Sequence, residues 1–194
     1  MRRTAVALAV LVAAPSFGFA AWSTRSTPIL PTALPAQAVQ PALDDPTIVA
    51  IFDAANTVDI ETGRLAAERG HSKEVRDFGA MLVRDHEHVR QMGRDLAKKL
   101  GVTPTPPKDD QSARDHAAAM AKLRGLQGEA FDHAFLQHEV AFHKAVIDAV
   151  NSTLMPAIKN QELKDLVAKV APAFQAHMVA AANLDKKLSG SSSR

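Results

Sequence analysis

Three histidines occupy positions at which helical spacing predicts apolar residues. His86 lies between Leu82 and Val89 at steps of four and three residues, and His143 and His177 hold equivalent positions in two later segments. Residues three and four apart share one helix face, so each histidine is expected to point inward or toward a neighbouring helix. Imidazole carries protons near neutral pH and is the commonest metal ligand, which makes these three the first candidates for chemistry.

Acidic residues accompany the three histidines. Asp85 lies on the apolar face of its segment, and Glu139 precedes His143 by four residues, a spacing that lets both side chains hold one ion. In an earlier segment, Glu61 and Asp59 lie on opposite rims of the apolar stripe, and periodicity alone does not choose between them.

Because a buried imidazole or carboxylate must be paired, these groups need an explanation. One interpretation is a divalent transition metal (Zn, Cu or Fe) bound by nitrogen and oxygen ligands. Its ligands would be His86, His143 and His177 with Asp85 or Glu61, and Asp59 and Glu139 are further candidates. A second interpretation is a structural hydrogen-bond network that fixes helix register. A hydrolase or oxidoreductase that uses the same cluster is a third, for which the sequence offers no substrate-pocket signature.

Composition excludes several classes of site. The chain has no cysteine, so disulfides, thiolate metal sites and cysteine nucleophiles are excluded. Of 23 basic residues, Arg2 and Arg3 lie in a predicted leader, which leaves 21 against 21 acidic residues. No basic cluster suits nucleic acid, and no phosphate-binding loop or nucleophile elbow occurs. The partners left open are a second copy of the chain and another envelope protein.

The N-terminal region has the pattern of an export signal. Arg2 and Arg3 precede an apolar run over 5–14 and a small-residue site that ends at Ala20. This order predicts a cleavable signal peptide over 1–20, with an apolar run too short for a comfortable membrane span. The mature protein is therefore expected in the periplasm or outside the cell, without a stable membrane span. Residues 21–44 predict a proline-rich linker, and 189–194 a disordered tail.

Residues 45–188 have the apolar periodicity of long helices. Apolar positions recur at steps of three and four, and Gly70 and Gly101 are stop signals. The pattern predicts four long helices and one short one, at 45–70, 72–100, 112–126 (the short one), 128–152 and 161–188. We expect an all-α fold, an antiparallel four-helix bundle with a short extra helix in the connection between the second and third helices.

Two stretches carry a family resemblance. The segments ETGRLAAERGHSKEVRDFGAMLVRDH (61–86) and GEAFDHAFLQHEVAFH (128–143), with 172–177, resemble signatures of an exported bacterial family called domain of unknown function 4142. The resemblance covers roughly residues 46–188 and implies a ferritin-like four-helix bundle with no established activity. The family's recurrent polar positions correspond to Asp59, Glu61, Asp85, His86, Asp132, His143 and His177.

The chain departs from the family pattern in its third long helix. Phe142 precedes His143 where the family often carries aspartate, and Phe135 stands where tyrosine is common. The sequence contains one Glu-x-x-His, Glu68 to His71, which runs through the stop signal at Gly70, whereas ferritin-type di-iron sites use two such motifs. A ferroxidase is therefore disfavoured and a mononuclear, histidine-rich site is more compatible. The expected function is metal handling or stress response in the envelope, and the alternative is a non-enzymatic envelope or interaction protein.

Overall fold

The structure is a computed structural model that describes residues 43–108 and 111–191. The predicted signal peptide, the linker up to residue 42 and residues 192–194 lie outside the described residues. Within the described ranges every regular element is helical, so the all-α class is confirmed. The elements are α1 (Asp45–Arg69), α2 (Lys73–Leu100), α3 (Gln111–Arg124), α4 (Gly128–Ala149), the π-helix η1 (Val150–Leu154), α5 (Met155–Ala157) and α6 (Gln161–Ser191).

The helix ends follow local sequence signals. The Asp44 side chain caps α1 by accepting a hydrogen bond from the Thr47 backbone N–H at 2.9 Å. Gly101 ends α2 in the left-handed conformation (φ 64°), which costs glycine little. Helix α6 continues through Pro172 and extends to Ser191, so the first three residues of the predicted tail are helical.

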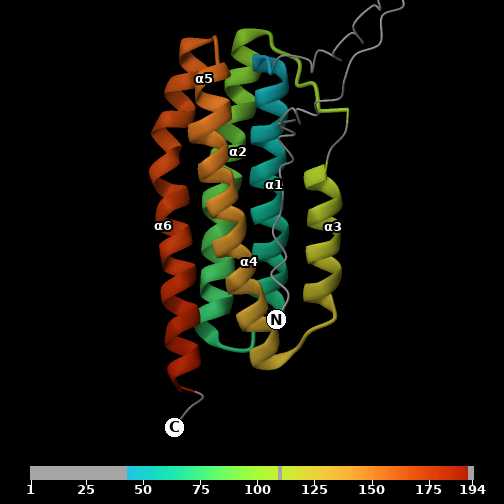
Figure 1. Ribbon diagram of the computed structural model, residues 1–194, viewed down its shortest axis with the longest axis vertical. Helices are drawn as coiled ribbons and strands as arrows, with labels where there is room; N and C mark the ends of the chain where they lie inside the picture. Colours follow the sequence, from blue (N-terminus) through green and yellow to red (C-terminus); the bar gives the residue numbers. More distant parts are fainter. Residues whose placement is uncertain (1–42, 109–110, 192–194) are drawn as a thin grey trace, which may run out of the picture. The chain divides into compact units, whose positions relative to one another are not determined.

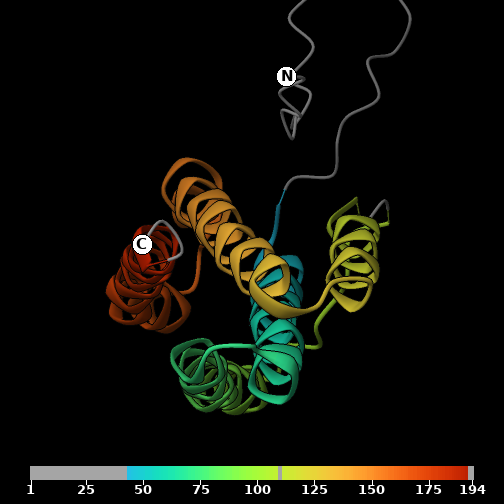
Figure 2. The same ribbon diagram turned by 90° about the horizontal axis from the view of Figure 1, so that it is seen from below.

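Four long helices lie side by side (Figures 1 and 2). Helix α1 packs against α2 and α4, and α6 also packs against α2 and α4. The connection that carries α3 returns along the other helices, so α2 and α4 run in the same direction while packed neighbours run in opposite directions (Figure 1). None of the described helices is long and apolar enough to cross a membrane.

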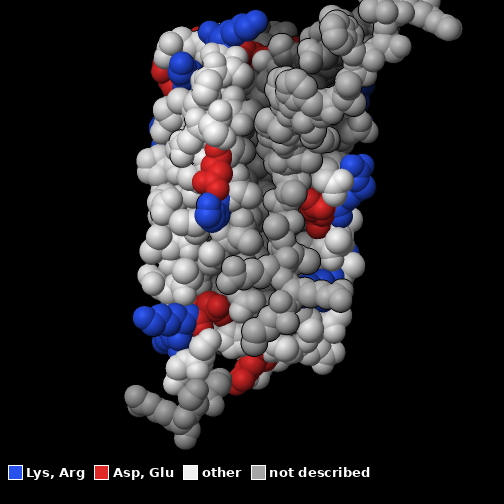
Figure 3. All heavy atoms as spheres, viewed as in Figure 1, with Lys and Arg blue, Asp and Glu red and all other residues white. Residues whose placement is uncertain are grey.

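Several charged side chains of the described residues lie beside a group of opposite sign, as Figure 3 shows for part of one face. Ion pairs join helices in the same way, as in Arg94 with Asp53 at 2.5 Å and Lys187 with Glu74 at 3.1 Å. Pairs as exposed as these add little stability each, so the fold depends on its interior.

The interior has apolar layers toward both ends of the helices. Phe131, Phe135 and Leu82 belong to one layer, and Ile48 and Leu163 belong to another at the opposite end. All five side chains are almost inaccessible to solvent. The polar groups discussed below lie between these layers, where a buried charge is costly unless it is paired.

Helices α1 and α2 approach closely through two glycines. A Cβ atom on Gly79 would lie 2.6 Å from the Gly63 carbonyl oxygen and 2.7 Å from the Ala67 nitrogen. Both are backbone atoms, so the helices would have to move apart. We expect Gly79→Ala to destabilise the protein by about 2 to 4 kcal/mol. Denaturant unfolding checks this, with Gly190→Ala, which meets no atom within 4 Å, as the near-neutral control.

Asp132 has a structural task at the start of α2. Its buried carboxylate accepts hydrogen bonds from the backbone N–H groups of His71 and Ser72, each at 2.8 Å. Replacing Asp132 by alanine should cost about 2 to 4 kcal/mol, because two partly buried backbone donors lose a charged acceptor. The exposed Asp77→Ala change should cost less than about 1 kcal/mol by the same denaturant measurement. Equal losses would contradict the capping role.

Candidate metal centre

The three inward histidines meet between the apolar layers. His86, His143 and His177 are buried, and their ring centroids lie 5.0 to 5.6 Å apart in pairs. One ligand atom from each lies within 4.8 Å of the other two. His86 and His177 are close to the middle of α2 and α6, and His143 is close to the middle of the continuous helical stretch formed by α4, η1 and α5 (128–157), so side-by-side packing brings all three to the same depth.

Asn56 fixes the tautomer of His86. The Asn56 side-chain nitrogen donates to the Phe52 carbonyl oxygen at 2.8 Å, which turns the amide oxygen toward His86 Nδ1 at 3.0 Å. Since that oxygen only accepts, His86 carries its proton on Nδ1. In the neutral ring, Nε2 is therefore left with a free lone pair.

A backbone carbonyl fixes His143 in the same way. His143 Nδ1 lies 3.0 Å from the Glu139 carbonyl oxygen, one helical turn earlier, and donates to it. Nε2 therefore carries no proton in the neutral ring. This nitrogen is buried and has no hydrogen-bond partner, so its lone pair is available to a cation.

Asp85 orients His177. His177 Nε2 lies 3.3 Å from an Asp85 carboxylate oxygen, to which it donates, so the neutral ring has its free lone pair on Nδ1. That Nδ1 lies 3.1 Å from His86 Nε2. Two nitrogens thus face each other at contact distance, and with both rings neutral neither has a proton to share.

The buried histidine rings resist protonation, so a shared proton does not stabilise the contact between the two nitrogens. Burial and, to a smaller extent, the neighbouring rings of His143 and His177 together lower the pKa of His86 to about 2. Burial also lowers the pKa of His143, to about 4, and that of His177. The neutral rings therefore present three lone pairs, and each other ring nitrogen donates to an amide, a carbonyl or a carboxylate. Ligating histidines in metal sites are held by partners of this kind.

Two buried carboxyl groups lie beside the histidines. Asp59 has an oxygen 3.4 Å from His86 Nδ1, and Glu139 accepts from the Thr62 hydroxyl at 2.8 Å. Both Asp59 oxygens and one Glu139 oxygen lack partners apart from the contact between the two acids. Burial, above all, raises the pKa of both groups, and mutual repulsion raises that of Asp59 further. Asp59, Glu139 and His143 also offer ligand atoms within 4.8 Å of one another.

Two of the predicted acids lie elsewhere. Glu61 is exposed and accepts from His116 of α3 at 2.8 Å, because its rim of α1 faces α3 while the Asp59 rim faces inward. The structure therefore does not bring Glu61 into the cluster. Asp85 is one-third exposed and lies at the edge of the cluster, where it touches His177 alone among the three histidines and also pairs with Arg84 at 3.0 Å.

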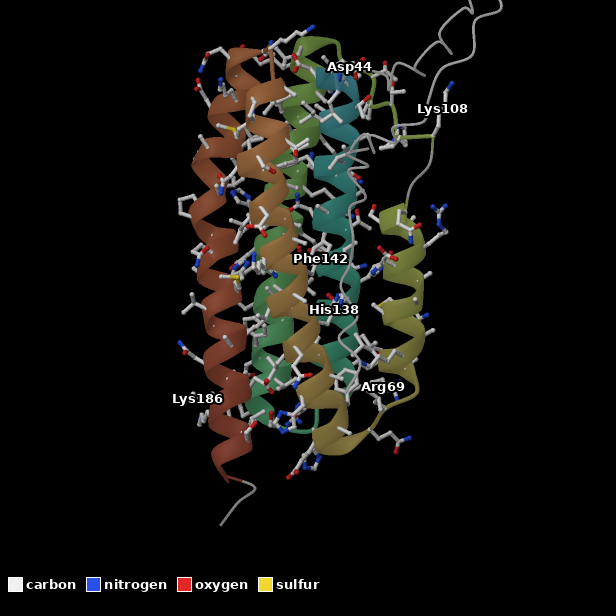
Figure 4. All side chains as sticks on the ribbon, in the orientation of Figure 1. Asp44, Arg69, Lys108, His138, Phe142 and Lys186 are labelled. Carbon is white, nitrogen blue, oxygen red and sulfur yellow. The ribbon has the colours of Figure 1, made fainter. Side chains whose placement is uncertain are left out.

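The remaining histidines lie outside the centre. His138 stacks on Phe142 one turn away on α4 (Figure 4), and burial lowers its pKa to about 4. His133 of the same helix pairs with Asp185 at 2.5 Å. The residue that sequence reasoning missed is Asn56, although it precedes Asp59 by three residues and so shares its rim of α1.

The fold and this cluster define an all-helical protein with a buried histidine and carboxylate centre. A family model described as "Domain of unknown function (DUF4142)" matches residues 30–184, and the chain belongs to that family. A solved structure with a similar fold is a DUF305 fragment from Deinococcus radiodurans, at a TM-score of 0.64 and 15% identity. The match covers 73% of this chain and 95% of that chain. A comparison with curated proteins gives no match.

Proposed function

We propose that this chain binds one divalent transition metal ion through His86 Nε2, His143 Nε2 and His177 Nδ1. The observation that carries the proposal is the convergence of three ring nitrogens, two of them 3.1 Å apart, on rings whose other nitrogens each face an oxygen acceptor. Nitrogen ligands about 2.0 to 2.1 Å from a tetrahedral ion lie roughly 3.3 Å from one another. The pair of His86 and His177, at 3.1 Å, already has this spacing, and a ligand atom of His143 lies within 4.8 Å of both. Imidazole ligands suit Zn, Cu and Fe.

The other polar residues have supporting roles in this proposal. Asn56 and Asp85 orient two ligands through their second ring nitrogens, as does the Glu139 carbonyl for the third. Asp59 and Glu139 lie close enough to supply carboxylate oxygens. Three nitrogen ligands leave one position of a tetrahedral ion for such an oxygen or for water.

The setting of the proposed site follows from the rest of the chain. The long connection between α2 and α4 is the kind found in ferritin-like bundles, and we propose that arrangement for the four long helices. The leader predicted over 1–20 supports export, which would place the site in the periplasm or outside the cell. A role in envelope metal handling or stress fits both features.

A structural network is the second candidate. The contacts of His86 with Asn56 and of His177 with Asp85 join α1, α2 and α6, which would fix helix register. This alternative leaves the 3.1 Å nitrogen contact without a proton, so we rank it second.

Reconstitution decides between the two. Metal-free protein is dialysed against Zn²⁺, Cu²⁺, Fe²⁺ or Mn²⁺, and bound metal is measured by elemental analysis. We expect one ion per chain for at least one metal, and loss of that ion in His86→Ala and His177→Ala. His88→Ala, an exposed position on α2, is the matched control. Stoichiometric binding that survives both cluster substitutions would overturn the proposal.

A further inference from the structure

A cavity of about 270 Å³ lies between α1, the C-terminal part of α4 with η1, and α6. All residues that line it are uncharged, and most are aliphatic or aromatic, among them Ile48, Val146, Leu154 and Val170. Well-packed interiors contain few voids larger than a water molecule, so a space of this size between long helices requires a cause.

The π-helix supplies part of that cause. Residues Val150, Asn151 and Leu154 belong to η1, and all three line the cavity. A π-helical turn is wider than an α-helical one and moves the following residues out of register, so it opens space at its own level. Such turns occur frequently at functional sites, and this one forms part of the cavity lining.

The cavity also reaches the histidine cluster. Asn56 lines it and accepts the hydrogen bond from His86 Nδ1. Phe174 lines it too, and its ring centroid lies 5.2 Å from that of His86 and 5.9 Å from that of His143. A molecule in the cavity would therefore be one side chain away from the cluster.

Size and lining define the molecule that fits. An apolar cavity of about 150 Å³ takes up benzene, so 270 Å³ corresponds to roughly ten carbon atoms. No charged group offsets an ionic ligand, whose transfer into such surroundings is costly. The exposed amides of Asn151 and Gln175 lie at the rim and suit one polar end group.

We infer that this cavity is a binding site for a small neutral molecule with an apolar body of about ten carbons and a single hydroxyl or carbonyl end. The apolar body lies among α1, α4 and α6, and the polar end lies at the amide rim. Binding there does not require a metal ion, so this site stands apart from the metal proposal.

The test uses the metal-free full chain and 1-naphthalenemethanol, a neutral bicyclic alcohol, in a calorimetric titration. We expect one molecule bound per chain. Ala171→Leu, which adds three carbons inside the cavity, should weaken binding by about tenfold or more, because apolar contacts are lost in proportion to the filled space. Ala55→Leu on α1 fills the same cavity from the opposite wall and should act in the same direction.

Two controls make the result specific. Ala176→Leu places the same side chain on an exposed position of α6 and should leave binding unchanged. 1-Naphthoate, which has a carboxylate on the same ring system, should bind more weakly than the alcohol because the lining has no cation. Absence of binding to the wild-type chain would overturn the inference. Equal binding by the folded Ala171→Leu, Ala55→Leu and Ala176→Leu variants would do the same, whatever the outcome of the metal titrations.

Discussion

Replacing His143 by alanine is expected to abolish the stabilisation that a divalent metal ion gives to this protein. A ligand that binds only the folded state raises the free energy of unfolding by about 4 kcal/mol at a thousandfold excess over its Kd. His143→Ala removes the unpartnered Nε2, one of three proposed ligands. The same Zn²⁺ concentration should then add less than about 1 kcal/mol. Denaturant unfolding with Zn²⁺ and with a chelator measures both values.

The comparison separates a metal site from a structural network. His143 is fully buried, so its loss should lower stability even in the chelator, and that loss alone favours neither interpretation. The diagnostic quantity is the difference that Zn²⁺ makes in each variant. His133→Ala, on the same helix but paired with Asp185, should keep the full effect. A Zn²⁺ effect of the same size in the wild type and His143→Ala would support the network.

The spacing of apolar residues correctly predicted which way a side chain faces when its residue lies in the middle of an apolar stripe. Steps of three and four residues were enough to turn His86, His143 and His177 inward, and the structure buries all three. Their common depth is a separate fact, because spacing says nothing about how far along a neighbouring helix a residue lies. His86 and His177 are near the centres of α2 and α6, but His143 is central only in the longer helical stretch 128–157, which the sequence pattern did not predict.

For residues at the rim of an apolar stripe, burial depends on which neighbouring helix covers that side, and the spacing does not give this. Asp59 and Glu61 have equal angular offsets, yet only Asp59 is buried, since the neighbouring long helices cover its side while α3 leaves Glu61 exposed. Asp85 has the spacing of a core residue but lies at an edge. The π-helix at 150–154 was also beyond prediction, because the apolar pattern indicated a helix that ends at 152 and the chain instead stays helical to Ala157.

The metal-free protein should lose stability as the pH rises above about 6.5, and Asp59→Asn should reduce that loss. Burial raises the pKa of Asp59 above 3.8 and that of Glu139 from 4.5 to about 7. A carboxyl group of this kind is protonated in both states at low pH. Its cost grows as the pH rises from the unfolded to the folded pKa, by up to about 1.4 kcal/mol per pH unit.

The buried histidines act in the opposite direction and in a different range. Burial lowers the pKa of His86, His138, His143 and His177 below 6.5. Their cost therefore grows as the pH falls below 6.5 and is absent above it. In the described residues the other shifted groups, Asp44, Glu74 and Arg94, titrate far from neutrality. Above pH 6.5 the pair of Asp59 and Glu139 accounts for the pH dependence.

Denaturant unfolding in a chelator at about pH 6.5, 7.5 and 8.5 should thus show a wild-type loss of stability, of at most about 1.4 kcal/mol per pH unit for each of the two carboxyl groups that is still protonated in the folded protein. Asp59→Asn retains a polar group of equal size that does not ionise, so only the Glu139 contribution remains and the loss should be clearly smaller. Glu61→Gln makes the same chemical change at an exposed position of α1 and should leave the wild-type slope intact. A flat wild-type profile matched by Asp59→Asn would mean that Asp59 is ionised in the folded protein. A carboxylate beside His86 Nδ1 would accept from that N–H and leave Nε2 free for a metal ion, so this outcome would contradict the raised pKa of Asp59 and not the metal site.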